Sequence, residues 1–233
     1  MMFGLTRGDR VLVVPTHPDD ETLGAGGTLA RFTEDGIEVH VLAITCYDLP
    51  RWGTPSTVAQ RAGEFEAACD VLGVSGRRIA WLGDDRAHRV HDHMPDLVRL
   101  IEDGPELSLN ALRPAALLIP TAGSVHQEHQ LIHRACYAAA RPAGAARYSP
   151  RIVLGFEGPE DRAWAPEAGR RPVLVDITAS ARRKDKALEC YASQLRDLAH
   201  PRSIERIRVI DAAAGAEIGA GRAEAFTPYR MAW

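Results

Sequence analysis

Long hydrophobic runs and paired cysteines are absent from this 233-residue chain. No apolar run approaches the ~20 residues of a membrane span, and residues 1–10 lack the apolar core of a signal peptide, so we expect a cytoplasmic protein without a membrane segment. The four cysteines are far apart and form no CxxC pair. This spacing is typical of reduced core thiols and argues against a disulfide framework.

The chain also lacks a strong charge of one sign and has few aromatic residues. Its 28 basic and 31 acidic residues give a net charge of −3, which argues against a nucleic-acid binder that depends on a strong basic field. Aromatic residues make up 6% of the chain, so a base-stacking platform is not expected. The length suits one large domain, and we predict that residues 1–233 form it.

Apolar runs alternate with segments of helical periodicity along most of the chain. We predict strands at residues 11–14, 38–45, 78–82, 115–120, 151–157 and 172–177. We predict helices at residues 22–34, 57–72, 95–102, 128–141 and 182–194, and loops at 46–56 and 161–171. Four successive strand–helix units indicate an α/β fold, with a Rossmann-like doubly wound, mostly parallel sheet and helices on both faces.

The first predicted strand runs directly into the sequence THPDDE at residues 16–21. Ligands of doubly wound sheets bind beyond the carboxyl ends of the strands, so this turn is a candidate site. Three grouped carboxylates repel one another unless a cation neutralises them, and imidazole together with carboxylate oxygen suits zinc. A helix N-terminus also favours acidic residues. That explanation accounts for neither His17 nor Pro18, which keeps the turn rigid.

The fourth predicted strand is followed by a second histidine cluster. His126 and His129 lie at its carboxyl end, and His133 follows one helical turn later. The site is not a zincin, because Gln130 stands where that motif requires Glu. His133 on its own is more typical of a core or exposed histidine than of a ligand. We expect the two clusters to converge on one metal with an open position for water, as in a catalytic zinc site.

Two further patterns have weaker implications. The histidines at 88, 91 and 93 are compatible with a second metal site. A polar, solvated substrate loop is the favoured interpretation, because these histidines have no regular ligand spacing. The glycines at 24–27 do not indicate a dinucleotide loop, since Leu29 stands where that fingerprint needs Gly.

The pattern HPDDExLGxGGTLA, followed by a His-x-acid-His after a later strand, resembles the LmbE/PIG-L-type metal-dependent de-N-acetylases. These include N-acetylglucosaminyl deacetylases of glycolipid, mycothiol, bacillithiol and antibiotic biosynthesis. Supporting matches are Arg61-x-x-Glu64, the strand-then-Asp element at 82–85, the D-I-T…K-A…S-Q segment within 176–194, and A-E-x-F at 223–226.

The resemblance implies a ligand set and two catalytic roles. His17, Asp20 and His129 would bind the metal, Zn²⁺ or another divalent ion. Asp19 would act as the general base towards water and then as the acid that protonates the leaving amine. His126 would polarise the acetyl carbonyl and stabilise the oxyanion. Such general-base catalysis contributes roughly 10²–10⁴-fold to rate.

The resemblance also implies substrate contacts, with two departures from the family pattern. Arg61 and Asp85 would hold sugar hydroxyls or phosphate, and Trp52 is a candidate for stacking on a sugar ring. Glu128 replaces the usual Asp between the histidines, where it would orient a histidine from behind. Residues 45–48 read TCYD in place of the family's T-x-G-E, at the expected pocket mouth.

The function implied is a zinc-dependent hydrolase that removes acetyl from an N-acetylamino-sugar conjugate in the biosynthesis of a glycoconjugate or natural product. Two alternatives are an amidase that cleaves a larger acyl group and a non-catalytic metal- or carbohydrate-binding protein. Asp19 and His126 argue against the second, since binding alone needs neither. The expected partner is a small amino-sugar conjugate and not a nucleic acid. The sequence leaves the aglycone, the metal and homo-oligomer formation open.

Overall fold

A single seven-stranded sheet organises the computed structural model, which describes residues 2–49, 55–143, 147–165 and 172–232. The strands are β1 (Arg10–Val13), β2 (Glu38–Cys46), β3 (Gly76–Leu82), β4 (Ala116–Pro120), β5 (Ile152–Phe156), β6 (Val173–Asp176) and β7 (Ala223–Met231). Their order is β3-β2-β1-β4-β5-β7-β6, and β7 is antiparallel to both of its neighbours. The predicted mostly parallel doubly wound sheet is confirmed, and all six predicted strands are present.

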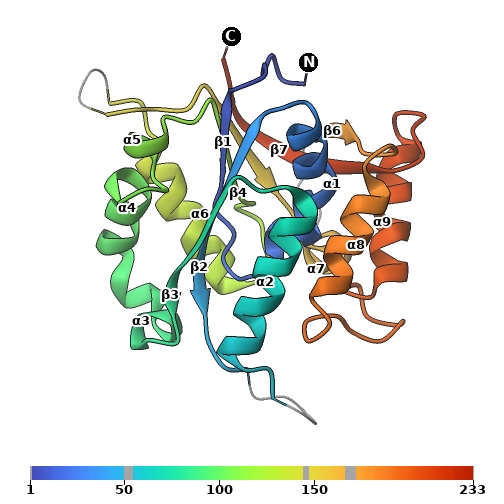
Figure 1. Ribbon diagram of the computed structural model, residues 1–233, viewed down its shortest axis with the longest axis horizontal. Helices are drawn as coiled ribbons and strands as arrows, with labels where there is room; N and C mark the ends of the chain where they lie inside the picture. The colour runs from blue at the N-terminus through green and yellow to red at the C-terminus, as the bar shows by residue number, and fades with distance from the viewer. Residues whose placement is uncertain (1, 50–54, 144–146, 166–171, 233) are drawn as a thin grey trace.

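Helices cover both faces of the sheet (Figure 1). One face carries α1 (Asp20–Glu34), α2 (Val58–Leu72) and α8 (Ala181–Cys190), with α9 (Ile204–Ala216) packed on α1 and α8. The other carries α3 (Asp85–His88), η1 (Val90–His93), α4 (Met94–Asp103), α5 (Leu109–Leu112) and α6 (Gln127–Ala139). Among the described residues, no helix has the length and apolar character needed to cross a membrane.

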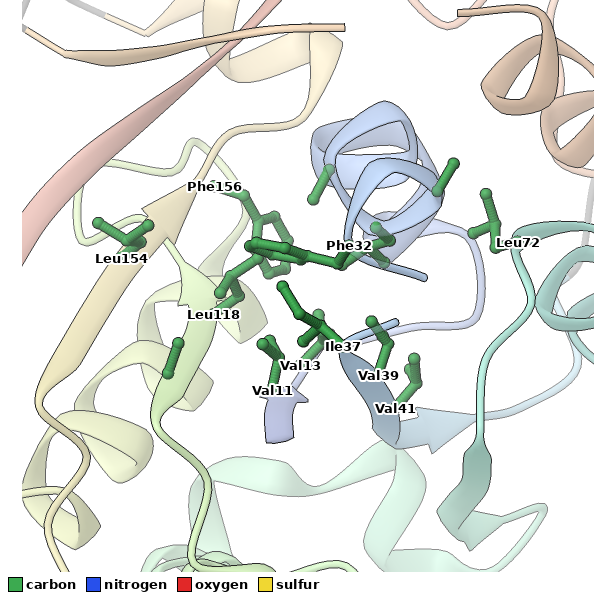
Figure 2. Packing of buried hydrophobic residues seen from close by; sticks show 14 of the residues in the cluster. Val11, Val13, Phe32, Ile37, Val39, Val41, Leu72, Leu118, Leu154 and Phe156 are labelled. Carbon is green, nitrogen blue, oxygen red and sulfur yellow. The ribbon is translucent and has the colours of Figure 1, made fainter. Parts of the chain in front are cut away.

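The two cores follow from the alternation of side chains along buried strands. Val11 and Val13 of β1 pack under α1 and α2, whereas Leu12 packs under α4 and α6 on the opposite face. Figure 2 shows the first core, in which Phe32 of α1 and Phe156 of β5 lie above the valines of β1 and β2. A strand buried on both faces is wholly apolar, which explains why the short β1 could be recognised in the sequence.

The position of β1 creates the site. Its two neighbours, β2 and β4, lie on opposite sides, and the chain crosses over in opposite directions to reach them. The loops after β1 and β4 therefore diverge above the carboxyl ends of adjacent strands, which is where doubly wound proteins bind ligands. The glycine-rich start of α1 lets it pack closely here. A Cβ at Gly24 would lie 2.9 Å from the carbonyl oxygen of Glu157.

Several elements differ from the sequence expectation: α3, η1 and α5 are not predicted from the sequence, and the helix expected at 182–194 ends at Cys190. The predicted loop at 161–171 begins within α7 (Pro159–Trp164), which proline at its first position and acidic residues in its first turn favour. Residues 166–171 of that loop lie outside the described residues. The last predicted helix is followed by α9 and β7, which the sequence analysis does not anticipate. Glu224 of β7 accepts hydrogen bonds from the backbone of α1 and pairs with the buried Lys184, at 2.8 Å, so this strand anchors α1.

Candidate metal centre

Two imidazoles and one carboxylate converge between the loop after β1 and the start of α6. Asp20 Oδ2 lies 3.4 Å from His17 Nδ1 and 3.2 Å from His129 Nε2. All three residues are buried, and their ligand atoms lie within 4.8 Å of one another. The three predicted ligands are therefore brought together, although His129 lies more than a hundred residues from the other two along the chain.

The spacing of these donor atoms fits a divalent metal. Ligand atoms about 2.0–2.1 Å from a tetrahedral zinc lie about 3.3 Å from one another, close to the separations at Asp20. The two nitrogens and one oxygen are the donors that zinc prefers, and three protein ligands leave a position for water. A second group, formed by His17, His126 and Glu128, also has its donor atoms within 4.8 Å.

Glu128 lies behind His17, opposite Asp20. Its Oε2 is 2.6 Å from His17 Nε2 and accepts a hydrogen bond of 3.2 Å from the Tyr47 hydroxyl. Nε2 donates to Glu128, and the Nδ1 atom of His17 faces Asp20. Burial disfavours the charged imidazole, but the hydrogen bonds that His17 donates to Asp20 and Glu128 outweigh this effect and raise the pKa of His17 to about 9. This is the carboxylate–histidine arrangement found behind metal ligands.

Asp19 is held in a strained conformation with one free oxygen. Its φ of 124° lies in a region that non-glycine residues rarely adopt. Oδ2 accepts a hydrogen bond of 3.0 Å from Arg202, whose guanidinium also donates to Glu160 at 2.6 Å. Oδ1 is buried and has no hydrogen-bond partner among the described residues. Burial raises the pKa of Asp19 to about 6, against the opposing effect of Arg202.

His126 is the N-cap residue of α6, and this position determines which of its ring nitrogens carries the proton. Its Nδ1 accepts a hydrogen bond of 3.2 Å from the backbone N–H of Glu128. Burial, together with the charges of His17 and His129, lowers the pKa of His126 to about 4. The ring is therefore neutral and carries its proton on Nε2, which makes that nitrogen a hydrogen-bond donor.

A cavity of about 210 Å³ opens beside these groups. Arg61 is buried, and its Nη1 donates to the carbonyl oxygen of Tyr47 at 2.9 Å. Arg196 donates to the backbone carbonyls of Gln194 and Leu195. Among the described residues, neither arginine has a carboxylate within ion-pair distance. The cavity is lined by His17, Asp19, Tyr47, Leu49, Arg61, His126, Glu160, Gln194, Arg196, His200 and Arg202.

The remaining predicted residues lie elsewhere. Asp85 is exposed in the first turn of α3 and is not part of the cavity lining, so a substrate contact from it stays a prediction. Trp52 lies outside the described residues. His133 is buried, 2.9 Å from the carbonyl oxygen of Pro120, and belongs to neither donor group. Within the described residues, His88, His91 and His93 form no metal-binding group either.

The sequence analysis missed several residues of the site. Glu160 and Asp161 follow β5, so the rule that chemistry lies behind strand ends could have identified them. Arg196 and Arg202 lie between α8 and α9, with no strand or motif to mark them. Arg202 and Asp19 are 183 positions apart, and no local pattern encodes such a contact.

The fold and donor set define a doubly wound α/β protein with a candidate divalent-metal centre at the switch point of its sheet. The family model of PIG-L, described as GlcNAc-PI de-N-acetylase, matches residues 12–140. This match covers more than half of the chain, which therefore belongs to the PIG-L family. It includes both histidine clusters and Arg61.

Individual relatives agree with this assignment. A 1D-myo-inositol 2-acetamido-2-deoxy-alpha-D-glucopyranoside deacetylase of Rhodococcus jostii is 33% identical over 165 residues, which are 60% of this chain and 56% of that protein. The chain thus spans just over half the length of this curated relative.

Two solved structures share the fold. The A40926 pseudoaglycone deacetylase Dbv21 has a TM-score of 0.74 at 23% identity and covers 97% of this chain and 99% of its own. GalB of Pseudomonas putida KT2440, a 4-carboxy-2-hydroxymuconate hydratase, has a TM-score of 0.70 at 20% identity and covers 95% and 96%. The same fold thus serves a deacetylase and a hydratase, and the function has to be argued from the site.

Proposed function

We propose that the protein is a metal-dependent hydrolase that removes the acetyl group from an N-acetylglucosaminyl conjugate. The observation that carries this proposal is the convergence of Asp20, His17 and His129, with the free oxygen of Asp19 beside them. His17 Nδ1, Asp20 Oδ2 and His129 Nε2 would hold the metal, zinc being the ion that this donor set suits. When bound, such an ion lowers the pKa of water and polarises the amide carbonyl.

Asp19 is the proposed base because only its Oδ1 is free to take a proton. Arg202 occupies Oδ2, so the carboxylate cannot rotate without breaking a buried ion pair. A pKa near 6 keeps the group ionised at neutral pH, yet basic enough to accept a proton from the attacking water. The same oxygen can then pass that proton to the leaving amine.

His126 is the proposed oxyanion donor. Its neutral ring donates from Nε2 and needs no proton from solvent, because the α6 backbone holds Nδ1 as an acceptor. A preorganised donor of this kind contributes on the order of 10²–10³-fold to rate. A protein that only bound metal or sugar would need neither this donor nor a free carboxylate oxygen at Asp19.

The charge of the cavity bears on the substrate. Asp19 and Glu160 both pair with Arg202, whereas Arg61 and Arg196 form no ion pair among the described residues. Unneutralised guanidinium groups attract carboxylate or phosphate. We therefore favour an N-acetyl amino-sugar conjugate with a negatively charged group next to the sugar.

An acetate-release assay tests the proposal directly. N-acetylglucosamine 1-phosphate and methyl N-acetylglucosaminide are compared before and after chelation, and again after zinc is restored. We expect chelation to abolish acetate release and zinc to recover it. Activity that survives chelation would overturn the metal mechanism. Release of a larger acid from N-acyl analogues, with none from the acetyl compounds, would instead identify an amidase for longer acyl groups.

A further inference from the structure

The hydrogen bonds behind His129 form a relay that nothing in the sequence indicated. The hydroxyl of Ser124 lies 3.2 Å from His129 Nδ1 and donates to Asp161 Oδ1 at 2.8 Å. Ser124, His129 and Asp161 are all buried, with exposures of 2%, 7% and 6%. Water therefore competes little for these bonds.

The Asp161 carboxylate also fixes the loop that carries Ser124. Its Oδ1 accepts a second hydrogen bond from the backbone N–H of Val125, at 2.9 Å, and its Oδ2 accepts one from Gly158, at 3.1 Å. The loop after β4 is thereby tied to the loop after β5. An ionised carboxylate only accepts hydrogen bonds, so the proton shared with Ser124 comes from the serine.

Counting protons then assigns the tautomer of His129. A serine hydroxyl has one proton, and here that proton goes to Asp161. Its oxygen can only accept from its other neighbours, which are the backbone N–H of His126, at 3.2 Å, and His129 Nδ1. His129 Nδ1 must therefore carry a ring proton, which leaves Nε2, 3.2 Å from Asp20, as the nitrogen available to a metal.

We propose that Ser124, held by Asp161, is the positioning residue that fixes His129 in the tautomer able to bind a metal through Nε2. The inference rests on the proposed function, because it assumes that His129 is a metal ligand. Glu128 performs the corresponding task for His17. The two imidazoles would thus be oriented by different groups. The Glu128 carboxylate contacts His17 directly, whereas His129 contacts the hydroxyl of Ser124, which in turn donates to the Asp161 carboxylate.

The first test determines the tautomer of His129 in the wild-type protein. Nitrogen-15 NMR of the metal-free protein at pH 8 distinguishes an Nδ1-protonated ring from an Nε2-protonated one, and His129→Ala identifies the signal. We expect the Nδ1-protonated form. A ring that carries its proton on Nε2 and none on Nδ1 would overturn the proposal, whatever the effect of any variant.

The second test measures zinc affinity by competition with a chromophoric chelator. Removal of a partner behind a metal ligand typically weakens metal binding 10–100-fold, and we expect a loss of this size for Ser124→Ala, together with a mixture of His129 tautomers. Ser124→Thr keeps the hydroxyl and should retain most of the affinity and the single tautomer. Asp161→Asn is the matched control, because its amide oxygen can still accept the serine proton. We expect it to keep the tautomer.

The outcomes separate this inference from the proposed function. If His129→Ala loses zinc while Ser124→Ala binds it as tightly as the wild type, the relay is refuted and the metal site stands. If His129→Ala itself binds zinc with unchanged affinity, the proposed metal site fails and the relay fails with it. Should Ser124→Ala not fold, the tautomer of the wild-type ring still decides the question.

Discussion

Replacing Asp19 with Asn should separate catalysis from metal binding and from stability. Asn has the same shape, but it cannot accept and release a proton. Loss of a general base costs roughly 10²–10⁴-fold in turnover, or about 3–5 kcal/mol in the activation barrier. Zinc should stay bound, because the ligand atoms belong to Asp20, His17 and His129. His129→Ala is the contrasting variant, which should lose the zinc itself.

The structure also predicts a gain in stability for Asp19→Asn. Burial raises the pKa of Asp19 from 3.8 to about 6 even with Arg202 beside it. Above pH 6 the folded state therefore holds this carboxylate ionised at a cost of about 3 kcal/mol relative to the unfolded chain. The neutral amide removes that cost, and Arg202 keeps its bond to Glu160. The metal-free variant should be more stable at pH 8 by up to about 3 kcal/mol.

Three measurements check this prediction: acetate release with saturating zinc, bound zinc per chain, and urea unfolding of the metal-free protein at pH 8. Turnover within tenfold of the wild type would refute the assignment of Asp19 as the base. Loss of zinc comparable to that of His129→Ala would show that Asp19 is a ligand. A marked loss of stability would show that the pair with Arg202 outweighs the burial of the charge.

Four further substitutions test the charge of Arg196, the burial of Glu21 and the backbone strain at Asp19. Arg196→Met should lower kcat/KM at least tenfold for N-acetylglucosamine 1-phosphate and leave it unchanged for the neutral methyl glycoside; an equal loss for both would show that Arg196 does not read charge. Burial raises the pKa of Glu21 from 4.5 to about 7, so the metal-free protein should lose about 3 kcal/mol of stability from this residue as the pH rises from 4.5 through 7. Glu21→Gln should flatten that slope in urea unfolding, and an unchanged slope would assign it to other groups. Asp19→Gly should be more stable than Asp19→Ala by about 1–3 kcal/mol, because glycine adopts the positive φ at this position without strain; equal unfolding midpoints would mean that the turn relaxes when the carboxylate is lost.

The parts of the fold that the sequence predicts are those whose pattern is local. β1 is apolar because both of its faces are buried, and α2 begins at a threonine cap, Thr57, and ends at Gly73 with a φ of 74°. β7 has no such pattern. It is antiparallel, carries the buried Glu224 and ends in partly exposed residues. Its place between β5 and β6 follows from tertiary pairing and not from periodicity.

The candidate site divides in the same way. The convergence of the two histidine clusters could be predicted because each lies in the segment that follows a strand, and adjacent parallel strands bring their ends together. The choice of His17, Asp20 and His129 as ligands comes from the resemblance to the family. Ser124 also follows a strand, but a serine in a loop gives no signal until its partner Asp161 is known. No local sequence pattern identifies Arg202, because its role depends on its contact with the buried carboxylate of Asp19.

Backbone strain, the bond to Arg202 and burial together determine the state of the Asp19 carboxylate. The backbone of Asp19 has a φ of 124°, which is strained for a non-glycine residue. Arg202 donates a hydrogen bond to Oδ2 of Asp19 and another to Glu160. Glu160 is not one of the proposed ligands, so the position of Arg202 does not depend on the metal. Burial favours the protonated acid, whereas Arg202 favours the carboxylate, and these opposing effects leave the pKa near 6. Neither effect alone would do this, because burial without the arginine would raise the pKa further, and an exposed carboxylate would be a weak base. A carboxylate with a pKa near neutral and one free oxygen has the properties of a general base for amide hydrolysis, which is the role proposed here for Asp19.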